Sequence, residues 1–189
     1  MAKLFHSLPN SIRIDGMDYD INTDFRVWIE IEKLLCSSES ASGDKLAKCL
    51  ALAYRELPPS PFAALEGLLT FYSSGRQNKS DCCPHAPSAP LYDLEADAEY
   101  IYGSFMSQYG IDLTDAELHW WKFRALLACL GEDCKFARVV SYRSTDTHEI
   151  KDARQKHFYE KMKRLYALPD NRTAEEKEMA LTESMNCLF

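Results

Sequence analysis

The sequence lacks the motifs through which many enzymes carry out their chemistry. It contains no glycine-rich phosphate-binding loop, no serine elbow and no His-Glu-x-x-His pair, which are signatures of nucleotide, ester and peptide chemistry. The five histidines are scattered along the chain, although a cysteine nucleophile would need one of them as a nearby base. We therefore expect no catalytic residues and no enzymatic activity.

Long apolar runs are also missing. No stretch of about 18 or more apolar residues occurs, so we expect no membrane-spanning helix. The opening residues, MAKLFHSLPNSIRID, lack the apolar segment of a secretory signal. The seven cysteines are odd in number and several fall within apolar helical patterns. This usage is typical of a reduced, cytoplasmic protein whose cysteines pack as small hydrophobic residues.

Metal ligands are few and poorly spaced. Cys82, Cys83 and His85 lie close together, but a structural zinc site takes four ligands in suitably spaced pairs. Cys129 and Cys134 could complete such a set only in a fold that nothing in the sequence indicates. We expect no metal and no cofactor, and we interpret these thiols as incidental to a variable loop.

Positive charge is in the minority. The net charge is −7 at pH 7, whereas a general nucleic-acid binder needs a basic surface. The composition therefore argues against nucleic acid as a partner. It does not determine the oligomeric state.

What the sequence does contain is the composition of a folded chain. Of its 189 residues, 46% are hydrophobic, enough to bury the core of one ordinary domain. We predict a mainly α fold, a single multi-helix domain over residues 1–168 with a short N-terminal β-hairpin at 12–21. Residues 73–90 are expected to form a mobile loop, and residues 169–189 an acidic helical tail. The apolar periodicity predicts helices at 24–35, 44–57, 61–72, 93–110, 133–143 and 148–168.

The hairpin has a specific turn signal. Asp15-Gly16 favours a two-residue turn. This turn pairs Ile14 with Met17 and Ile12 with Tyr19, and it sets Arg13 opposite Asp18, so that unlike charges face each other.

Two adjacent tryptophans stand in the segment LHWWKFRALLACL, at 118–130. The Thr114–Glu117 capping box predicts that a helix begins just before them. This helix is apolar nearly all round, which is typical of a central, buried helix. A binding groove is the alternative, because tryptophans are frequent hot spots. The expected core residues here and on the preceding helix are Leu118, Trp120, Trp121, Phe123, Leu127, Ile101 and Phe105.

The predicted helix at 148–168 is basic in an acidic protein, and its apolar residues Phe158, Met162, Leu165 and Tyr166 share one side. We predict that a partner binds here, with Lys161, Lys163 and Arg164 as contacts, assisted by Leu181 and Met185 of the acidic tail. Pro169 separates the two, so the tail could fold back on the basic helix until a partner displaces it. The alternatives are a merely solvated helix face and a frayed chain end.

Three segments, YDLEADAEYIYGSFMSQYGIDL, LHWWKFRALLACL and CKFARVVSYR, resemble the phage gene product 15 family of tailed phages and prophages of Gram-positive bacteria. The strongest match covers residues 92–143; YDINTDFRVWIEIEKLL fits the family start less distinctively, and residues 73–90 carry no family signature. The resemblance implies a tail assembly chaperone in the cytoplasm of the infected or lysogenic host, with the tape-measure or tube protein as its partner. It implies no catalytic residues.

Two other functions stay open. The chain could be a structural virion component, such as a tail completion or connector protein, or a nucleic-acid-binding regulator that uses the basic helix.

Overall fold

The computed structural model describes residues 7–36, 42–73 and 90–169, and within these ranges the chain is mainly α-helical, as predicted. The predicted loop at 73–90 and tail at 169–189 lie almost wholly outside the described residues. The elements in order are β1 (Ser11–Ile14), β2 (Met17–Asp20), α1 (Phe25–Cys36), α2 (Ser42–Ala53), α3 (Pro61–Tyr72), α4 (Ala98–Tyr109), α5 (Trp120–Ala128), α6 (Lys135–Ser144) and α7 (Ala153–Leu165).

The hairpin pairs in the predicted register. Ile12 lies opposite Tyr19, and Arg13 forms an ion pair with Asp18 at 3.4 Å. Asp15 and Gly16 both have positive φ angles, 50° and 85°, which matches the twist that a two-residue hairpin turn requires. The hairpin packs on α3 where Gly67 allows the two to approach closely, since a Cβ there would lie 2.9 Å from Ile12 Cγ2.

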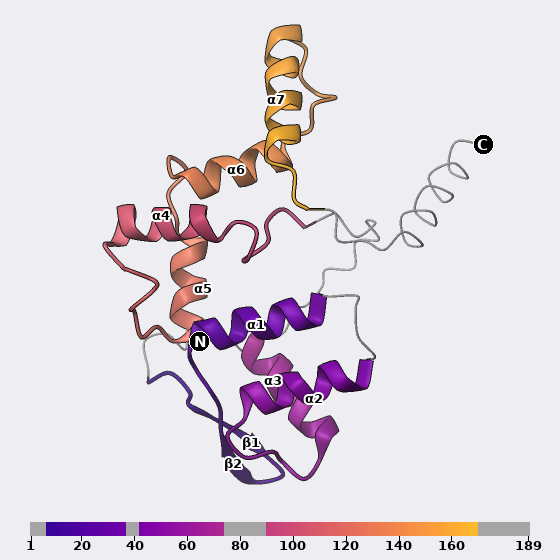
Figure 1. Ribbon diagram of the computed structural model, residues 1–189, viewed down its shortest axis with the longest axis vertical. Helices are drawn as coiled ribbons and strands as arrows, with labels where there is room; N and C mark the ends of the chain where they lie inside the picture. The colour runs from indigo at the N-terminus through magenta and orange to yellow at the C-terminus, as the bar shows by residue number, and fades with distance from the viewer. Residues whose placement is uncertain (1–6, 37–41, 74–89, 170–189) are drawn as a thin grey trace, which may run out of the picture.

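An extended segment, residues 20–24, connects the hairpin to α1 and bonds to two other parts of the chain. On one side, Asn22 N donates to Ala53 O at 2.7 Å. On the other, Trp120 N donates to Thr23 O at 2.8 Å and Phe25 N donates to Leu118 O at 3.1 Å. These bonds align the end of α2, the start of α1 and the start of α5 (Figure 1).

The core contains a continuous run of aromatic rings. Trp28 of α1 lies 4.8 Å from Phe71 and 6.2 Å from Trp120 between ring centroids. Phe123 stacks at 4.8 Å on Phe25 and at 5.4 Å on Phe105. Helices from both halves of the sequence therefore share one core, to which α7 contributes no buried residue.

The two tryptophans of α5 also bond to the end of α3. The last four carbonyls of a helix have no partner within it, yet in α3 each has a donor. Ser73 serves those of Leu69 and Thr70, and Trp121 Nε1 donates to Phe71 O at 2.8 Å. Tyr72 O accepts from Trp120 Nε1 at 3.1 Å and from Arg124 at 2.7 Å. The adjacent tryptophans thus combine apolar burial with capping.

Two predicted helix starts are wrong. Thr114 does not cap α5, because its hydroxyl donates to Asp112 at 2.6 Å and residues 113–115 form a turn. The chain then stays non-helical until Trp120, where it bonds to residues 23–25. α4 begins at Ala98 rather than at 93. The Asp93 carboxylate accepts the backbone N–H groups of Glu95 and Ala96 and holds a turn before the helix.

Two further helices are shorter than predicted. α2 ends at Ala53 rather than at 57, since the Ala53 carbonyl accepts Asn22 N. α7 begins only at Ala153, where the Asp152 side chain accepts from Gln155 N at 2.7 Å as an N-cap. In both cases a hydrogen bond that the apolar periodicity does not indicate determines where the helix ends or begins.

The capping of α3 predicts unequal costs for two similar substitutions. Trp121→Phe removes the indole donor to the Phe71 carbonyl and leaves this buried oxygen only the Ser73 N–H, which it shares with the Leu69 carbonyl; the loss of such a bond costs roughly 1 kcal/mol. Trp120→Phe should cost less, because the Tyr72 carbonyl still accepts from Arg124. Urea denaturation of both variants measures the difference in unfolding free energy. Equal losses would contradict the capping role.

Candidate functional site

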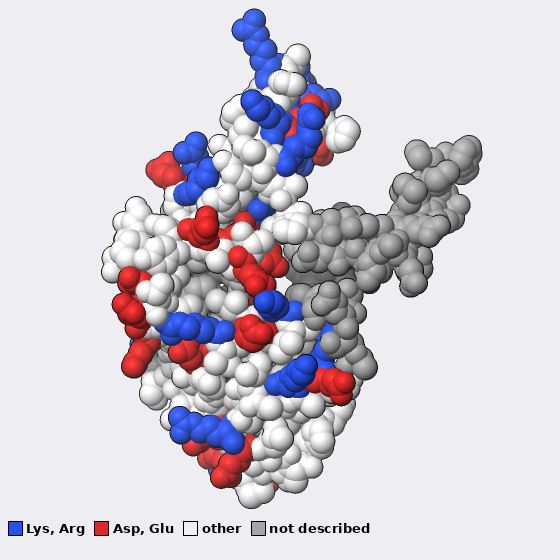
Figure 2. Space-filling model, in the orientation of Figure 1, with Lys and Arg blue, Asp and Glu red and all other residues white. Residues whose placement is uncertain are grey.

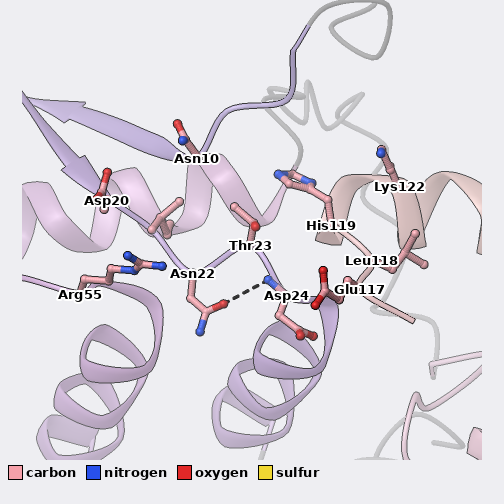
Figure 3. Close-up of a pocket in the computed structure, with 11 residues that line it drawn as sticks. Asn10, Asp20, Asn22, Thr23, Asp24, Arg55, Glu117, Leu118, His119 and Lys122 are labelled. Atoms are coloured by element: carbon pink, nitrogen blue, oxygen red, sulfur yellow. Dashed lines mark hydrogen bonds between the residues drawn. The ribbon is translucent and has the colours of Figure 1, made fainter. Parts of the chain in front are cut away.

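A mostly polar groove of about 510 Å³ lies where the hairpin, α1 and α5 meet (Figure 3). Its charged residues are mixed in sign, with Asp20, Asp24 and Glu117 against Arg55 and Lys122. Asp24 already binds Arg26 at 3.1 Å. The remaining lining residues are Asn10, Ile21, Asn22, Thr23, Leu118 and His119.

His119, the histidine of this groove, caps a helix. Its Nδ1 accepts from Trp121 N at 3.0 Å, and its Nε2 lies 3.1 Å from the carbonyl oxygen of Pro9. The accepting Nδ1 requires the neutral ring with its proton on Nε2, which then donates to Pro9 O. Burial, opposed by the bond to Pro9 and assisted by the charge of Lys122, lowers the pKa of His119 below its ordinary value. Both ring nitrogens are therefore engaged in holding the start of α5.

Metal-binding geometry is missing from the described part of the chain. Within it, no three His, Cys, Asp or Glu side chains are placed to hold an ion, and Cys49, Cys129 and Cys134 are free thiols. Cys82, Cys83 and His85 lie outside the described residues. None of the helices described is long and apolar enough to cross a membrane.

A second candidate site is the arm formed by α7, which projects from one end of the molecule (Figure 1). α7 has no buried residue. Rings attach it to α6: Tyr142 lies 6.1 Å from Phe158 and 5.8 Å from Tyr166 between centroids. Lys135 lies over the Tyr166 ring at 4.4 Å. The arm is thus joined to the body through one side of the helix only.

Arg143 is the polar anchor of this arm. Its guanidinium binds the Asp97 carboxylate through two hydrogen bonds of 2.6 and 2.8 Å, and it also donates to the carbonyls of Tyr166 and Leu91. The pair is nearly excluded from water, with side chains 10% and 1% exposed. One arginine therefore connects α6, the start of α4 and the end of α7.

Positive charge gathers on the arm, as Figure 2 shows, whereas both signs mix over the body. One exposed face of α7 carries Arg154, Phe158, Lys161 and Leu165, at helical spacings of four, three and four. Phe158 is 47% and Leu165 65% exposed. We call these four residues the α7 stripe. Alternating cations and apolar side chains suit a partner with acidic and apolar residues on one face.

The structure places the residues singled out by sequence in three groups. Ile101, Phe105, Trp120, Trp121 and Phe123 are buried, and Leu118 and Leu127 pack partly buried against them. Lys161 and Arg164 are exposed and Lys163 is partly buried, while Leu181 and Met185 lie outside the described residues.

The sequence predicts that the apolar residues of α7 share one side, and the structure divides them by exposure. Phe158 and Tyr166 both contact Tyr142 of α6, but Phe158 is still about half exposed and Leu165 is largely exposed. The available signal was the placement of Arg154 and Lys161 in line with the two apolar residues. The roles of Arg143 and Asp97 were missed as well, because no local pattern pairs residues 46 positions apart.

The family comparison matches most of the chain. A model of the family described as bacteriophage Gp15 protein matches residues 4–168. No curated protein and no solved structure matches the chain.

The Arg143 anchor predicts a large loss of stability in Arg143→Leu. The substitution leaves the buried Asp97 carboxylate without its cation, which typically costs 3–5 kcal/mol. Lys33→Leu is the matched control, since it removes an exposed ion pair with Glu95 and should barely change the urea midpoint. Equal midpoints for the two variants would show that the anchor contributes little.

The His119 cap predicts a pH-dependent stability. Because the folded pKa lies below the ordinary value of 6.5, the unfolded chain takes up a proton that the folded chain resists. The contribution is fully present above pH 6.5 and is lost as the pH falls below it. His119→Asn keeps an N-cap side chain but does not titrate. Its unfolding free energy should therefore fall less between pH 7.5 and 5.5 than that of the native chain. Parallel pH profiles would rule out this cap as the cause.

Proposed function

Because the chain belongs to the bacteriophage Gp15 protein family, we propose that it is a non-enzymatic tail assembly protein, a chaperone that binds tape-measure or tube subunits in the host cytoplasm before they polymerise. The observation that carries this proposal is the arm. A helix of 13 residues is marginal in water by itself, and helices of this length usually gain stability by burying an apolar face. α7 instead leaves Leu165 largely exposed and Phe158 about half exposed, although the Phe158 ring contacts Tyr142, and both lie between cations.

The attachment of α7 supports a docking role. Its inner side contacts α6 through Tyr142 and Tyr166, so its orientation is set before a partner arrives. A surface ordered in advance loses less conformational entropy on binding. The cations can also guide an acidic partner, because the body offers no comparable basic cluster on the face that Figure 2 shows.

The groove gives weaker support for a function of its own. Its histidine caps α5, and Asp24 binds Arg26. A general base must be free to take a proton from a substrate, and protonation of His119 at Nδ1 would break the cap. This arrangement supports a structural role for the groove and a non-enzymatic role for the chain.

The proposal predicts capture through the arm. Tagged full-length chain expressed in infected cells should capture the tape-measure or tube protein, identified by mass spectrometry. The reversal Arg154→Glu/Lys161→Glu should remove most of this capture, most clearly at low salt, where charges are least screened. The matched control Arg55→Glu/Lys122→Glu reverses the two groove cations and should leave capture intact. Loss only in the control would assign binding to the groove.

Purified virions separate a chaperone from a structural component. A chaperone is absent from the finished particle, so mass spectrometry should find the tube protein and not this chain. Stoichiometric presence of the chain in virions would instead support a tail completion or connector role.

A further inference from the structure

We propose that the α7 stripe is a docking surface for an acidic amphipathic segment, and that in the free protein its occupant is the chain's own residues 170–189. A tail subunit with a matching face would then bind by displacing this segment. This inference rests on the proposed function, because displacement of residues 170–189 controls binding only if the tail subunit binds to the arm.

The stripe itself offers a defined pattern. Phe158 and Leu165 are seven residues apart, or about two turns, so they lie about 10 Å apart along the helix. Arg154 and Lys161 alternate with them on the same exposed face. The pattern therefore fits a segment with two apolar residues about two turns apart and acidic residues beside them.

Residues 170–189 have this pattern in their sequence. Leu181, Met185 and Leu188 recur at spacings of four and three, which places apolar side chains on one side of a helical segment. The acidic residues of the segment outnumber its basic residues: they are Asp170, Glu175, Glu176, Glu178 and Glu183, against Arg172 and Lys177. The charge balance is opposite to that of α7, so the two segments attract.

The position of the segment in the chain makes the contact easy to reach. Residue 170 follows the end of α7 at Leu165 by only five positions. α7 has 13 residues and spans about 20 Å, and even a helical segment of the same length could run back along it. A short tether also gives an effective concentration in the millimolar range, so a weak contact suffices to cover Phe158 and Leu165.

Zero-length carbodiimide crosslinking of the full-length chain tests this contact, because it joins lysines only to carboxylates that touch them. We expect links from Lys161 to Glu178 or Glu183 at low salt, and their loss at high salt. The exposed pair Lys33–Glu95, 2.8 Å apart, supplies an internal control for the reaction and for the folded body. No link from Lys161 to the segment, with the control link present, would overturn the proposal.

Two variants keep every lysine and carboxylate and remove only apolar groups. Leu181→Ser/Met185→Ser changes the segment, and Leu165→Ser changes the stripe while it keeps the contact of Phe158 with Tyr142. Each should abolish the Lys161 links and leave the Lys33–Glu95 link unchanged. Links that persist in both variants would mean that charge alone brings the groups together, which overturns docking on the stripe.

Mixing unlabelled with ¹⁵N-labelled chain identifies the occupant. Links within single chains carry one isotope, as we expect, whereas mixed-isotope links would assign the stripe to a second copy and overturn the proposal. The outcome is distinguishable from that of the proposed function. Crosslinks can form in a chain that captures no tail protein, and capture through the arm can occur in a chain that forms no crosslinks.

Discussion

The docking of α5 on the carboxyl end of α3 is the interaction on which the rest of the structure depends. The end of α3 lies against the core, where the Phe71 ring is buried, so its terminal carbonyls need donors from the protein. Trp120 and Trp121 supply indole N–H groups, and their rings extend the aromatic stack to Trp28. The same two side chains thus satisfy polar groups and bury apolar area. Because α3 and α5 come from different halves of the sequence, this contact also joins the halves.

What could be predicted from the sequence is what nearby residues determine. The hairpin register follows from Asp15-Gly16, and α3 begins at Pro61 after the Ser60 cap, as Ser60-Pro61 indicates. Gly110 ends α4 with a positive φ of 65°. The predicted start of α5 is wrong because distant partners compete with the local signal, and that of α4 is wrong because the Asp93 side chain holds a local turn. Bonds to residues 23–25 hold 118–119 outside the helix, so the local capping box at Thr114 has no helix to cap. The spacing of Arg154 and Lys161 indicates the exposed face of α7, but how far Phe158 is exposed depends on its contact with Tyr142, which no local pattern predicts.

The arm and the body are stabilised in different ways. The body buries aromatic rings, whereas α7 buries none of its residues and relies on Arg143 and on contacts with Tyr142. The bidentate pair of Arg143 with Asp97 fixes α6 against the start of α4, and the single bond from Arg143 Nε to the Tyr166 carbonyl then holds the end of α7 without covering its outer face. Because the arm is held in this way, Phe158 and Leu165 can stay exposed and need not be buried in the core. Substitutions in the stripe should therefore be largely independent of those in the core.

The distribution of charge favours the arm over the rest of the chain as the binding site for an acidic partner. The net charge of −7 does not come from the arm and tail, since the excess of cations in 148–168 is offset by the excess of acids in 169–189. The rest of the chain carries the net negative charge, so on balance it disfavours an acidic partner, whereas Arg154 and Lys161 on the arm favour one. Unlike charges across a contact add more to selectivity and to the rate of encounter than to affinity. In the proposed docking, the apolar pair Phe158 and Leu165 supplies the binding energy, so a competing segment has to match both the charges and the apolar residues of the stripe.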